Sequence, residues 1–417
     1  MKHILLICYT FPPNPGIGGR RWAKFSKFLT KENYSIDVFN AKLIDNYKSL
    51  WLKDVENNAA ITIYSHLFFL QKLIVNPVSF TQKVFKRLIF SICQFLKINP
   101  NIITSFPNRK IYKAVEQHVT KNNIQTVIVS GDPYLFYYTS KLKKKINFNL
   151  ILDYRDLWND HSFYGKNIRF TKKQKRFFEF AENYAVNNCD TILFVDKGLE
   201  SIVKKRITNT TIKTYVLHNG FDESDYDPII KKNNYNNDDL KLIFAGNISS
   251  DVNEIFTNFL NSFYKLSIDN INLYNKITIE IISNIDAQLL DDIKQLGLKN
   301  VFCNNTILPF EQYKKHVLKK DIGLIHLSNE YKNSFATKFG DFLNLDLFIV
   351  SIGYRGDFAE FIESNKIGLH YDMNSDSSFF EKLNSAFLTR KKIDNALLNT
   401  FNLQNITTKL IEIINYD

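Results

Sequence analysis

A glycine-rich segment followed by two arginines lies near the start of the chain. Residues 11–22 have the sequence FPPNPGIGGRRW and come directly after a short apolar run. Glycines such as Gly18 and Gly19 let backbone N–H groups approach a ligand closely, and a helix that begins here favours an anion. The pattern is not a strict GxGxxG, so it does not indicate a dinucleotide site. The glycines could form a simple turn, but Arg20 and Arg21 favour ligand contact.

Two more loops of the first half concentrate charged side chains after apolar runs. One has the sequence SGDP and contains Asp132, and the other has the sequence DYRDLW and contains Asp153, Arg155, Asp156 and Trp158. Ligands bind outside the carboxyl ends of the strands in an open parallel sheet, which is where these loops fall. A salt-bridged turn is the alternative, but this density of charge favours a binding site.

The second half carries a different pair of motifs. Gly246 and Asn247 end an apolar run, and Lys338 and Asp341 lie in the sequence TKFGDF at the expected start of a helix. A carboxylate one turn into a helix can accept hydrogen bonds from a ribose diol, and a lysine at the helix start can neutralise phosphate. Alternatively, the two residues are an N-terminal acid and a solvated base, and the spacing alone does not decide.

These loops must be positioned by α/β units, because short apolar runs alternate with longer amphipathic runs through both halves. In the first half we expect strands at residues 4–8, 36–39, 126–129, 150–154 and 192–195, and helices at 22–29, 134–142 and 172–188. After an Asn-rich stretch at 222–239, we expect strands at residues 240–244, 277–282, 322–325 and 348–350. The sequence therefore predicts two α/β domains with parallel sheets.

The stretch of about 43–105 interrupts this alternation. It is aromatic and basic, with Phe68, Phe69, Phe85 and Phe90 among its lysines and arginines. We interpret it as an insertion of helices that carry both apolar and basic side chains, as helices at a membrane surface do. Ordinary core helices with solvated lysines are an equally good explanation.

Composition excludes several classes of protein. The chain has 417 residues, of which 45% are hydrophobic, and it contains 36 Phe and 21 Tyr, too much aromatic surface for a disordered chain. The cysteines occur singly at positions 8, 93, 189 and 303, which indicates neither a disulfide framework nor a zinc site and favours a reducing compartment. No apolar run approaches the length of a membrane-spanning helix, and the first residues predict a strand rather than an export signal.

The net charge of +12 is unevenly distributed. Residues 1–220 contain 34 Lys and Arg against 15 Asp and Glu, a net +19, whereas residues 221–417 contain 20 against 27, a net −7. A basic half suggests a polyanionic partner. No nucleic-acid-binding motif is present, so we expect a membrane surface or a phosphorylated substrate and no nucleic acid.

Six motifs in this order resemble the family-4 retaining glycosyltransferases, in the branch with an Arg-Asp-x-Trp loop that serves bacterial surface-polysaccharide assembly. They are the three loops of the first half, the sequence HNGFD at 218–222, the sequence FAGN at 244–247 and TKFGDFL at 337–343. The resemblance extends from the first strand to about Glu363. It implies the GT-B fold: two Rossmann-like domains with parallel sheets facing across a cleft. It also implies a crossover at Asn219 and Gly220.

By position, the resemblance places Asp341 where the family has the glutamate that binds the ribose hydroxyls, and Lys338 keeps its place. Two features depart from the family. Asn333 occupies the position of the first glutamate of a paired motif, although Glu330 is close by. The Arg and Lys that commonly follow the first glycine of the C-terminal domain are absent after Gly246. Diphosphate neutralisation is therefore assigned to Lys338 and backbone N–H groups.

These observations lead to one main hypothesis. Residues 1–220 form the acceptor-binding domain and residues 221–417 the domain that binds the nucleotide-sugar, with the last helices able to pack back on the first domain. We expect a retaining, metal-independent transferase without a cofactor that acts in the cytoplasm, peripherally on the inner face of the membrane. The catalytic candidates are Asp156 and Arg155. Donor-binding candidates are Gly18, Gly19, Gly246, Asn247, Glu330, Lys338 and Asp341, and acceptor-binding candidates are Arg20, Arg21, Asp132, Asp153 and Trp158.

Two alternatives stay open. A nucleotide-sugar 2-epimerase also uses two Rossmann-like domains, but it would need several carboxylates and a histidine around the sugar, and no such cluster is evident. A non-catalytic scaffold at the membrane is the second alternative. The departures at Asn333 and Asn247 leave it possible, and turnover by the purified chain would exclude it.

Overall fold

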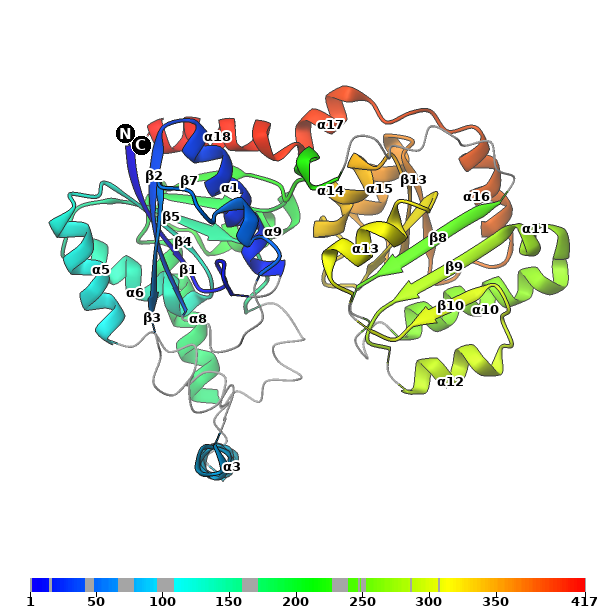
Figure 1. Ribbon diagram of the computed structural model, residues 1–417, viewed down its shortest axis with the longest axis horizontal. Coiled ribbons are helices and arrows are strands. Elements are labelled where there is room, and N and C mark those ends of the chain that lie inside the picture. Colours follow the sequence, from blue (N-terminus) through cyan, green and yellow to red (C-terminus); the bar gives the residue numbers. More distant parts are fainter. Residues whose placement is uncertain are drawn as a thin grey trace. The chain divides into compact units, whose positions relative to one another are not determined.

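The computed structural model describes residues 2–14, 17–41, 49–66, 79–95, 109–159, 172–226, 239–246, 248, 253–285, 287–306 and 308–416. The chain divides into two compact units. Unit 1 consists of Met1–His218 and Ile406–Asp417, and unit 2 consists of Asn219–Asn405. In Figure 1 unit 1 contains the blue to green elements together with the red helix α18 (Leu403–Tyr416). Unit 1 is therefore assembled from two separate segments of the chain.

Unit 1 is built on a seven-stranded parallel sheet with the order β3-β2-β1-β4-β5-β6-β7. Its strands are β1 (Lys2–Cys8), β2 (Tyr34–Ala41), β3 (Ile61–His66), β4 (Thr126–Ser130), β5 (Asn149–Tyr154), β6 (Thr191–Phe194) and β7 (Lys213–Val216). In addition to α18, unit 1 contains the described helices α1 (Arg20–Lys31), α3 (Phe80–Phe95), α5 (Arg109–Lys121), α6 (Pro133–Lys143), α8 (Lys172–Val186) and α9 (Lys197–Val203). Short 3-10 turns are η1 (Ile17–Gly19), η2 (Leu52–Asp54) and η3 (Lys204–Arg206).

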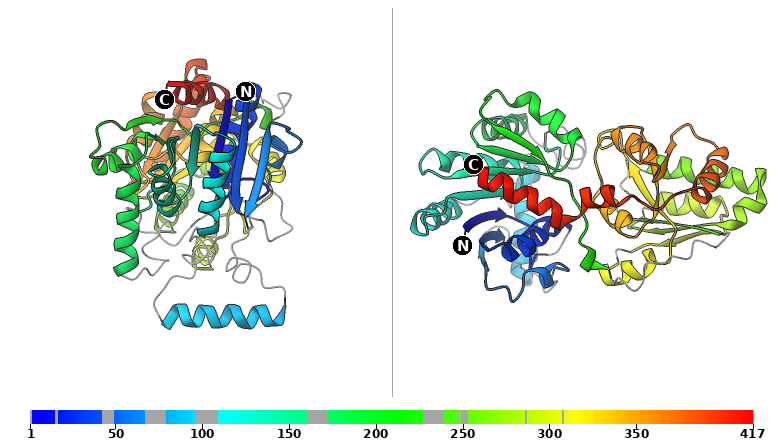
Figure 2. Two further views of the ribbon diagram at one scale, coloured as in Figure 1. Left: turned by 90° about the vertical axis from the view of Figure 1, so that its left-hand side faces the viewer. Right: turned by 90° about the horizontal axis from the view of Figure 1, so that it is seen from above.

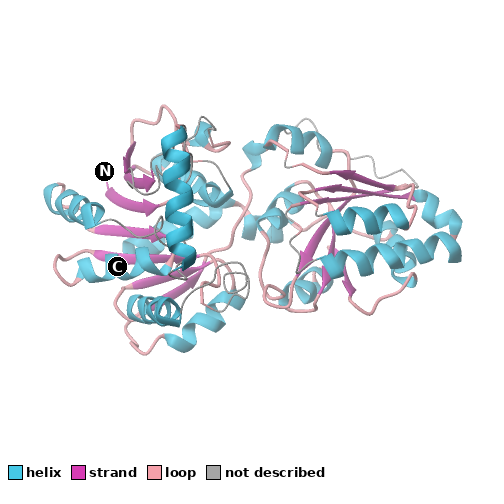
Figure 3. Cartoon of the chain, turned by 90° about the horizontal axis from the view of Figure 1, so that it is seen from below, coloured by secondary structure: helices cyan, strands magenta, loops and turns pink. Residues whose placement is uncertain are grey.

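Unit 2 is built on a six-stranded parallel sheet with the order β10-β9-β8-β11-β12-β13. Its strands are β8 (Leu240–Ala245), β9 (Ile277–Ile282), β10 (Val301–Asn304), β11 (Ile322–Leu327), β12 (Phe348–Gly353) and β13 (Gly368–Asp372). Its helices are α10 (Asn253–Asp269), α11 (Ile271–Lys276), α12 (Ala287–Gln295), α13 (Phe310–Val317), α14 (Thr337–Asn344), α15 (Asp357–Ser364), α16 (Ser378–Leu388) and α17 (Asn395–Phe401), and η4 (Glu223–Asp225) is a 3-10 turn. Figures 2 and 3 show helices on both faces of this sheet.

The strands are buried because their apolar runs face helices on both sides. All six residues of β12 are buried, and so are the last five residues of β1. The order of each sheet reverses once, between β1 and β4 in unit 1 and between β8 and β11 in unit 2. Ligands of open parallel sheets bind outside the carboxyl ends of the strands at this point of reversal. The loops that follow these four strands are therefore the places to search for a site.

The predicted α/β architecture is confirmed, and each of the nine predicted strands overlaps an observed one. The prediction of helices throughout 43–105 is wrong for Ile61–His66, which forms the edge strand β3 against β2. This strand shows no continuous apolar run, because an edge strand is buried less than the centre of a sheet. Within the same stretch, residues 43–48, 67–78 and 96–105 lie outside the described residues. The helical prediction holds for α3.

Two chain segments pair where unit 2 begins and ends. Phe221 forms a parallel bridge with Asn402, through hydrogen bonds from the Phe221 N–H to the Phe401 carbonyl and from the Leu403 N–H to the Phe221 carbonyl, both 2.9 Å. Beyond this bridge α18 joins unit 1, where the Tyr34 hydroxyl donates to Asn415 Oδ1 at 2.9 Å. Most of α18 therefore belongs to unit 1.

Candidate functional site

The carboxyl end of β8 in unit 2 brings a lysine against a glycine. Lys338 lies in the first turn of α14, and its Nζ is so close to Gly246 that a β-carbon added to this glycine would lie 2.6 Å from it. The same nitrogen lies 6.0 Å from the centre of the Phe244 ring. Only glycine at position 246 leaves room for the Lys338 ammonium at the end of β8.

The environment of Lys338 changes its acidity. Burial disfavours the charged ammonium and lowers the pKa of Lys338 from 10.5 to about 8, although the nearby Asp341 carboxylate partly opposes the change. The lysine is still mainly protonated at neutral pH. Its charge is therefore available to an anionic ligand, which would also relieve the cost of burying it.

Asp341 lies one turn after Lys338 on the same helix and is 2% exposed. The helix approaches the start of unit 2 closely, since a β-carbon at Gly340 would lie 3.0 Å from the carbonyl carbon of Gly220. No side chain caps α14, because its N-cap residue is Ala336. The first turn of α14 therefore begins without a side-chain hydrogen bond to its N–H groups.

Other donor-binding candidates of unit 2 lie apart from this pair or outside the described residues. Asn333 accepts a hydrogen bond from the Asp357 N–H at 3.0 Å and thereby supports the first turn of α15. Glu330 is half-buried in the turn after β11. Asn247 lies outside the described residues.

In unit 1 the end of β5 holds a buried charge network. Asp153 is fully buried, and its carboxylate accepts hydrogen bonds from Trp22 Nε1 at 2.7 Å, Ser130 Oγ at 2.7 Å and Arg21 Nε at 3.1 Å. Burial lowers the pKa of Arg21, and Asp153 opposes this change. The network fixes the helix α1 to the ends of β4 and β5, which is a positioning role.

The glycine-rich loop folds back onto the end of β1. A β-carbon at Gly19 would lie 2.4 Å from the Thr10 carbonyl oxygen, so only glycine fits at this position. The carbonyl of Gly18 accepts a hydrogen bond from Arg155 Nη1. Gly18, Arg21, Asp153 and Arg155 therefore come together, as their place at adjoining strand ends predicts.

The remaining candidates of unit 1 have separate environments. Arg20 is 3% exposed, and its guanidinium lies 4.9 Å from the centre of the Trp51 ring. Asp132 accepts a hydrogen bond from the Leu135 N–H at 3.0 Å and begins α6. Asp156 and Trp158 are half-buried, and Trp158 packs against Phe178 of α8. Among the charged candidates of this loop, Asp156 is more exposed than the fully buried Asp153.

Sequence reasoning did not select Trp22 and Ser130 as site residues, although both lie in the quoted motifs. The position of Ser130 in the sheet could have indicated its role. It lies level with Cys8 and Asp153 on the two neighbouring strands, so its hydroxyl is close to the Asp153 carboxylate. His218, from the HNGFD motif, donates through Nδ1 to the Val195 carbonyl at 3.0 Å, and burial lowers its pKa to about 4. Arg21 Nη1 donates to the His218 carbonyl at 3.0 Å. The histidine is therefore neutral at physiological pH.

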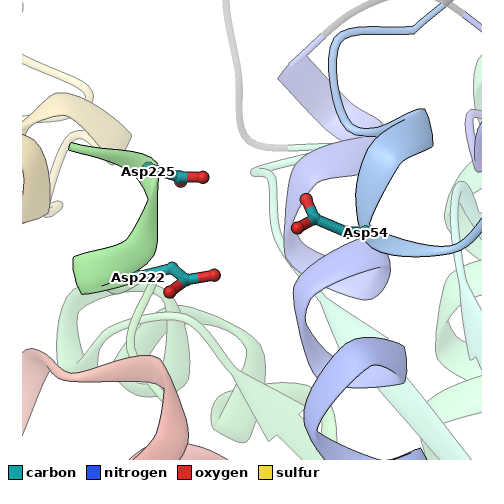
Figure 4. Close-up of side chains that lie close together, drawn as sticks. All are labelled: Asp54, Asp222 and Asp225. Atoms are coloured by element: carbon teal, nitrogen blue, oxygen red, sulfur yellow. The ribbon is translucent and has the colours of Figure 1, made fainter. Parts of the chain in front are cut away.

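Three further aspartates, labelled in Figure 4, have partners within their own units. Asp222 begins η4 by accepting hydrogen bonds from the Ser224 N–H and hydroxyl at 3.0 and 2.8 Å. The Asp225 carbonyl accepts a hydrogen bond from Lys314 Nζ at 3.0 Å. Asp54 of η2 pairs with the buried ammonium of Lys24 at 3.0 Å. The side chains of Asp222 and Asp54 thus stabilise local structure of their own units, whereas Asp225 contributes its backbone carbonyl.

Comparison with known proteins shows which solved structures have a similar fold. No protein-family model and no curated protein matches the chain in sequence. The structure is similar to sucrose-phosphate synthase from Thermosynechococcus elongatus, with a TM-score of 0.65 at 10% identity over 100% of this chain and 99% of the other. It is also similar to an α,α-trehalose-phosphate synthase (UDP-forming) from Burkholderia vietnamiensis, with a TM-score of 0.58 at 6% identity over 100% of both chains.

The chain has the GT-B fold. A putative UDP-N-acetylglucosamine 2-epimerase from Listeria monocytogenes is similar as well, with a TM-score of 0.54 at 9% identity over 99% of this chain and 96% of the other. The expected fold class is thus confirmed, while identities this low are informative about the fold alone. Within the described residues, no helix is both long and apolar enough to cross a membrane.

Proposed function

We propose that this protein is a glycosyltransferase that moves a sugar from a nucleotide-sugar to a glycan or polyprenyl-diphosphate-linked acceptor, with retention at the anomeric carbon. The observation that supports it best is the placement of Lys338 beside Gly246 with Asp341 one turn further along α14. A buried ammonium on a helix that begins without a side-chain cap suits a diphosphate, and a carboxylate one turn further along suits a ribose diol. The UDP-forming synthase among the similar structures supports a UDP-linked donor.

The proposed chemistry needs charge stabilisation on the leaving group. The bond between the anomeric carbon and the diphosphate oxygen breaks, and the oxygen of the acceptor hydroxyl forms a new bond on the same face of the sugar. The proton of that hydroxyl passes to the departing diphosphate oxygen. Negative charge that develops on the diphosphate is stabilised by Lys338 and by the N–H groups at the start of α14. We propose that these groups serve without a metal ion or a cofactor.

Unit 1 supplies the acceptor side in this proposal. Asp156 and Arg155 are the proposed catalytic polar groups, whereas Asp153 and Arg21 hold the loops that carry them. Arg155 is tied to the glycine-rich loop through Gly18. A change in this loop would therefore also shift Arg155, which couples the two motifs physically.

We further propose that the chain acts in bacterial surface-polysaccharide biosynthesis, on the inner face of the cytoplasmic membrane. The +19 charge of residues 1–220 supports attachment to an anionic surface, where a lipid-linked acceptor would be found. This location would bring unit 1 to the acceptor.

The test is a donor screen with the purified chain. A ligand at about 100 times its Kd adds about 2.7 kcal/mol to the free energy of unfolding, so a binding UDP- or GDP-sugar raises the melting temperature measurably. Turnover with an acceptor, the anomeric configuration of the product and insensitivity to EDTA then test the finer claims. If no nucleotide-sugar binds, the proposal is wrong.

A second candidate function is a nucleotide-sugar 2-epimerase, which the similarity to the Listeria monocytogenes protein favours. The two activities differ in their need for an acceptor. Conversion of the donor sugar to its epimer in the absence of any acceptor would support the epimerase. Donor binding without epimerisation or transfer to any acceptor would support the non-catalytic scaffold.

A further inference from the structure

Helix α3 of unit 1 is exposed along its whole described length. Of its side chains at 80–89 and 91–92, none is buried, and Phe80 and Leu88 are 81% and 54% exposed. Figures 1 and 2 show α3 apart from the sheet of unit 1 and from the helices that cover this sheet. A helix with large apolar side chains in water needs another surface to cover them.

The exposed apolar residues share one face of α3. Phe80, Val84, Leu88 and Ile92 recur every four residues, and Phe85 lies beside them, so at 100° per residue all five fall within an arc of about 140°. An arc of this width is typical of a helix that buries one side in a continuous apolar phase.

The helix is specified by its own sequence rather than by packing. The Gln82 N–H donates to Ser79 Oγ at 3.2 Å, and the Ser79 N–H donates to Gln82 Oε1 at 3.2 Å, which is a reciprocal capping box. This motif satisfies two N–H groups at the start of α3 without help from the rest of unit 1. Local hydrogen bonds therefore support the helix although its described side chains are not buried.

The charge around α3 is of one sign. Lys83, Lys86 and Arg87 lie on the helix, and the 59 residues from Asn57 to Val115 contain eight Lys or Arg and no Asp or Glu. A second copy of the chain would bring like charges together across α3. An anionic bilayer provides both an apolar phase for the stripe and phosphates for the basic residues.

A second basic cluster of unit 1, at residues 141–145, is less available to a membrane. Lys143 pairs with Asp190 at 2.7 Å, and Lys141 and Lys144 lie over tyrosine rings at 5.3 and 4.9 Å. These lysines have partners within the unit, so they do not favour a particular external surface. This contrast directs the inference to α3.

We propose that α3 is an interfacial helix that lies in the headgroup region of an anionic bilayer. Its apolar face enters the acyl boundary, and Lys83, Lys86 and Arg87 contact lipid phosphates. The proposal rests on the proposed function only for its biological purpose, access to a lipid-linked acceptor, and it deepens the membrane attachment given there. Its physical basis is the exposure, the arc and the charge of α3.

The experiment is co-sedimentation of the full chain with vesicles, without any nucleotide-sugar. One set contains phosphatidylcholine with 30 mol% phosphatidylglycerol, and the other contains phosphatidylcholine alone. We expect binding to the anionic vesicles at about 50 mM salt and release at about 500 mM, because salt screens the attraction. Weak binding to the neutral vesicles is expected, since the apolar face alone contributes less than both terms together.

Two groups of variants separate charge from apolar contact. The charge variant is Lys83→Glu/Lys86→Glu/Arg87→Glu, and the apolar variant is Val84→Ser/Leu88→Ser/Ile92→Ser. Their matched controls change exposed residues of unit 2 and are Lys265→Glu/Lys299→Glu/Lys319→Glu and Ile268→Ser/Ile271→Ser/Leu388→Ser. Each basic residue contributes to the partition coefficient, so we expect the charge variant to bind anionic vesicles about 100-fold more weakly. Both controls should bind like the unchanged chain.

Several outcomes overturn the proposal. Equal partitioning of the unchanged chain to both vesicle types, absence of binding to either, or binding that neither α3 variant weakens would each do so. A dimer that becomes monomeric in the apolar variant, measured by light scattering without lipid, would instead assign the face to a second copy. The thermal shift with nucleotide-sugars is recorded in parallel, so a failure of the donor site is distinguished from a failure of membrane binding.

Discussion

Lys338 Nζ occupies the space that a side chain at Gly246 would need, with 2.6 Å between the nitrogen and an added β-carbon. The contact joins the end of β8 to the start of α14, which are far apart in the sequence. We infer that the glycine determines where the ammonium lies, and thus where a diphosphate would be held. The first predictions depend on this pair.

Gly246→Ala should leave the fold intact and weaken donor binding. The nearest obstructing atom is the end of the flexible Lys338 side chain, which can move away at little cost to stability, and the Phe244 ring at 3.3 Å needs to shift only slightly. We expect the donor Kd to rise about tenfold, equivalent to about 1.4 kcal/mol of binding free energy, by calorimetry. In the background of Lys338→Met, the same change should have little further effect. An equal loss in both backgrounds would show that the glycine acts independently of the lysine.

Donor affinity should fall as the pH rises through 8. The pKa of Lys338 is lowered to about 8, and a bound diphosphate would raise it, so binding above pH 8 requires uptake of a proton. We expect the donor Kd to increase about fivefold between pH 8 and pH 9, and the increase to disappear in Lys338→Met. In the free protein, Lys338 binds more protons in the unfolded chain than in the folded chain between pH 8 and 10.5. Its contribution to the free energy of unfolding therefore rises with pH over that range.

Asp341→Ala should weaken the donor without unfolding unit 2. Loss of a charged acceptor from a neutral diol costs about 1.5 to 3 kcal/mol, so the donor Kd should rise about tenfold or more. Uridine nucleotides with a 2′-deoxyribose provide the control, since they should discriminate less between the two proteins. An unchanged Kd for the ribose nucleotide would mean that the carboxylate only supports the helix.

Asp153→Ala should lower the stability of unit 1, whereas Asp156→Asn should lower the rate of turnover. The first leaves Arg21 buried without its carboxylate, which should cost about 3 to 5 kcal/mol of unit 1 stability. All three tryptophans of the sequence, at 22, 51 and 158, belong to unit 1, so their fluorescence in a urea titration reports this unit alone. Asp156→Asn should reduce turnover with little change in the midpoint. A large fall of stability in Asp156→Asn would remove its proposed catalytic role.

His218 should make unit 1 sensitive to acid. Its pKa is about 4 in the folded protein because of burial, against 6.5 when unfolded, so the unfolded chain binds more protons in this window. The stability contributed above pH 6.5 is lost as the pH falls toward 4. Compared with His218→Gln, the unchanged chain should lose about 2 kcal/mol between pH 7 and pH 4.5, by tryptophan fluorescence in urea. Parallel pH profiles of the two proteins would contradict the assignment.

The sequence predicts the central strands well because their apolar runs are continuous, as in Ile4–Cys8. It fails at the edge, where Ile61–His66 alternates apolar and polar residues. The sequence motif predicts that Lys338 and Asp341 lie at the start of a helix, as they do in α14. The contact between Lys338 and Gly246 could not be predicted, because it depends on how β8 and α14 pack together. The burial of Asp153 could not be predicted either, since a charged residue at the end of a strand has the same sequence signal whether it faces a ligand or Trp22.

The division of unit 1 into two chain segments has a consequence for biogenesis. The Tyr34 hydroxyl meets Asn415, and Leu410 of α18 is fully buried, so this helix completes a structure that began with the first strand. During synthesis, unit 2 has all of its residues before unit 1 does. Unit 1 therefore cannot complete its fold until the last residues are made, although most of its chain is synthesised first. A nascent chain stopped near residue 405 should consequently leave unit 1 dependent on chaperones.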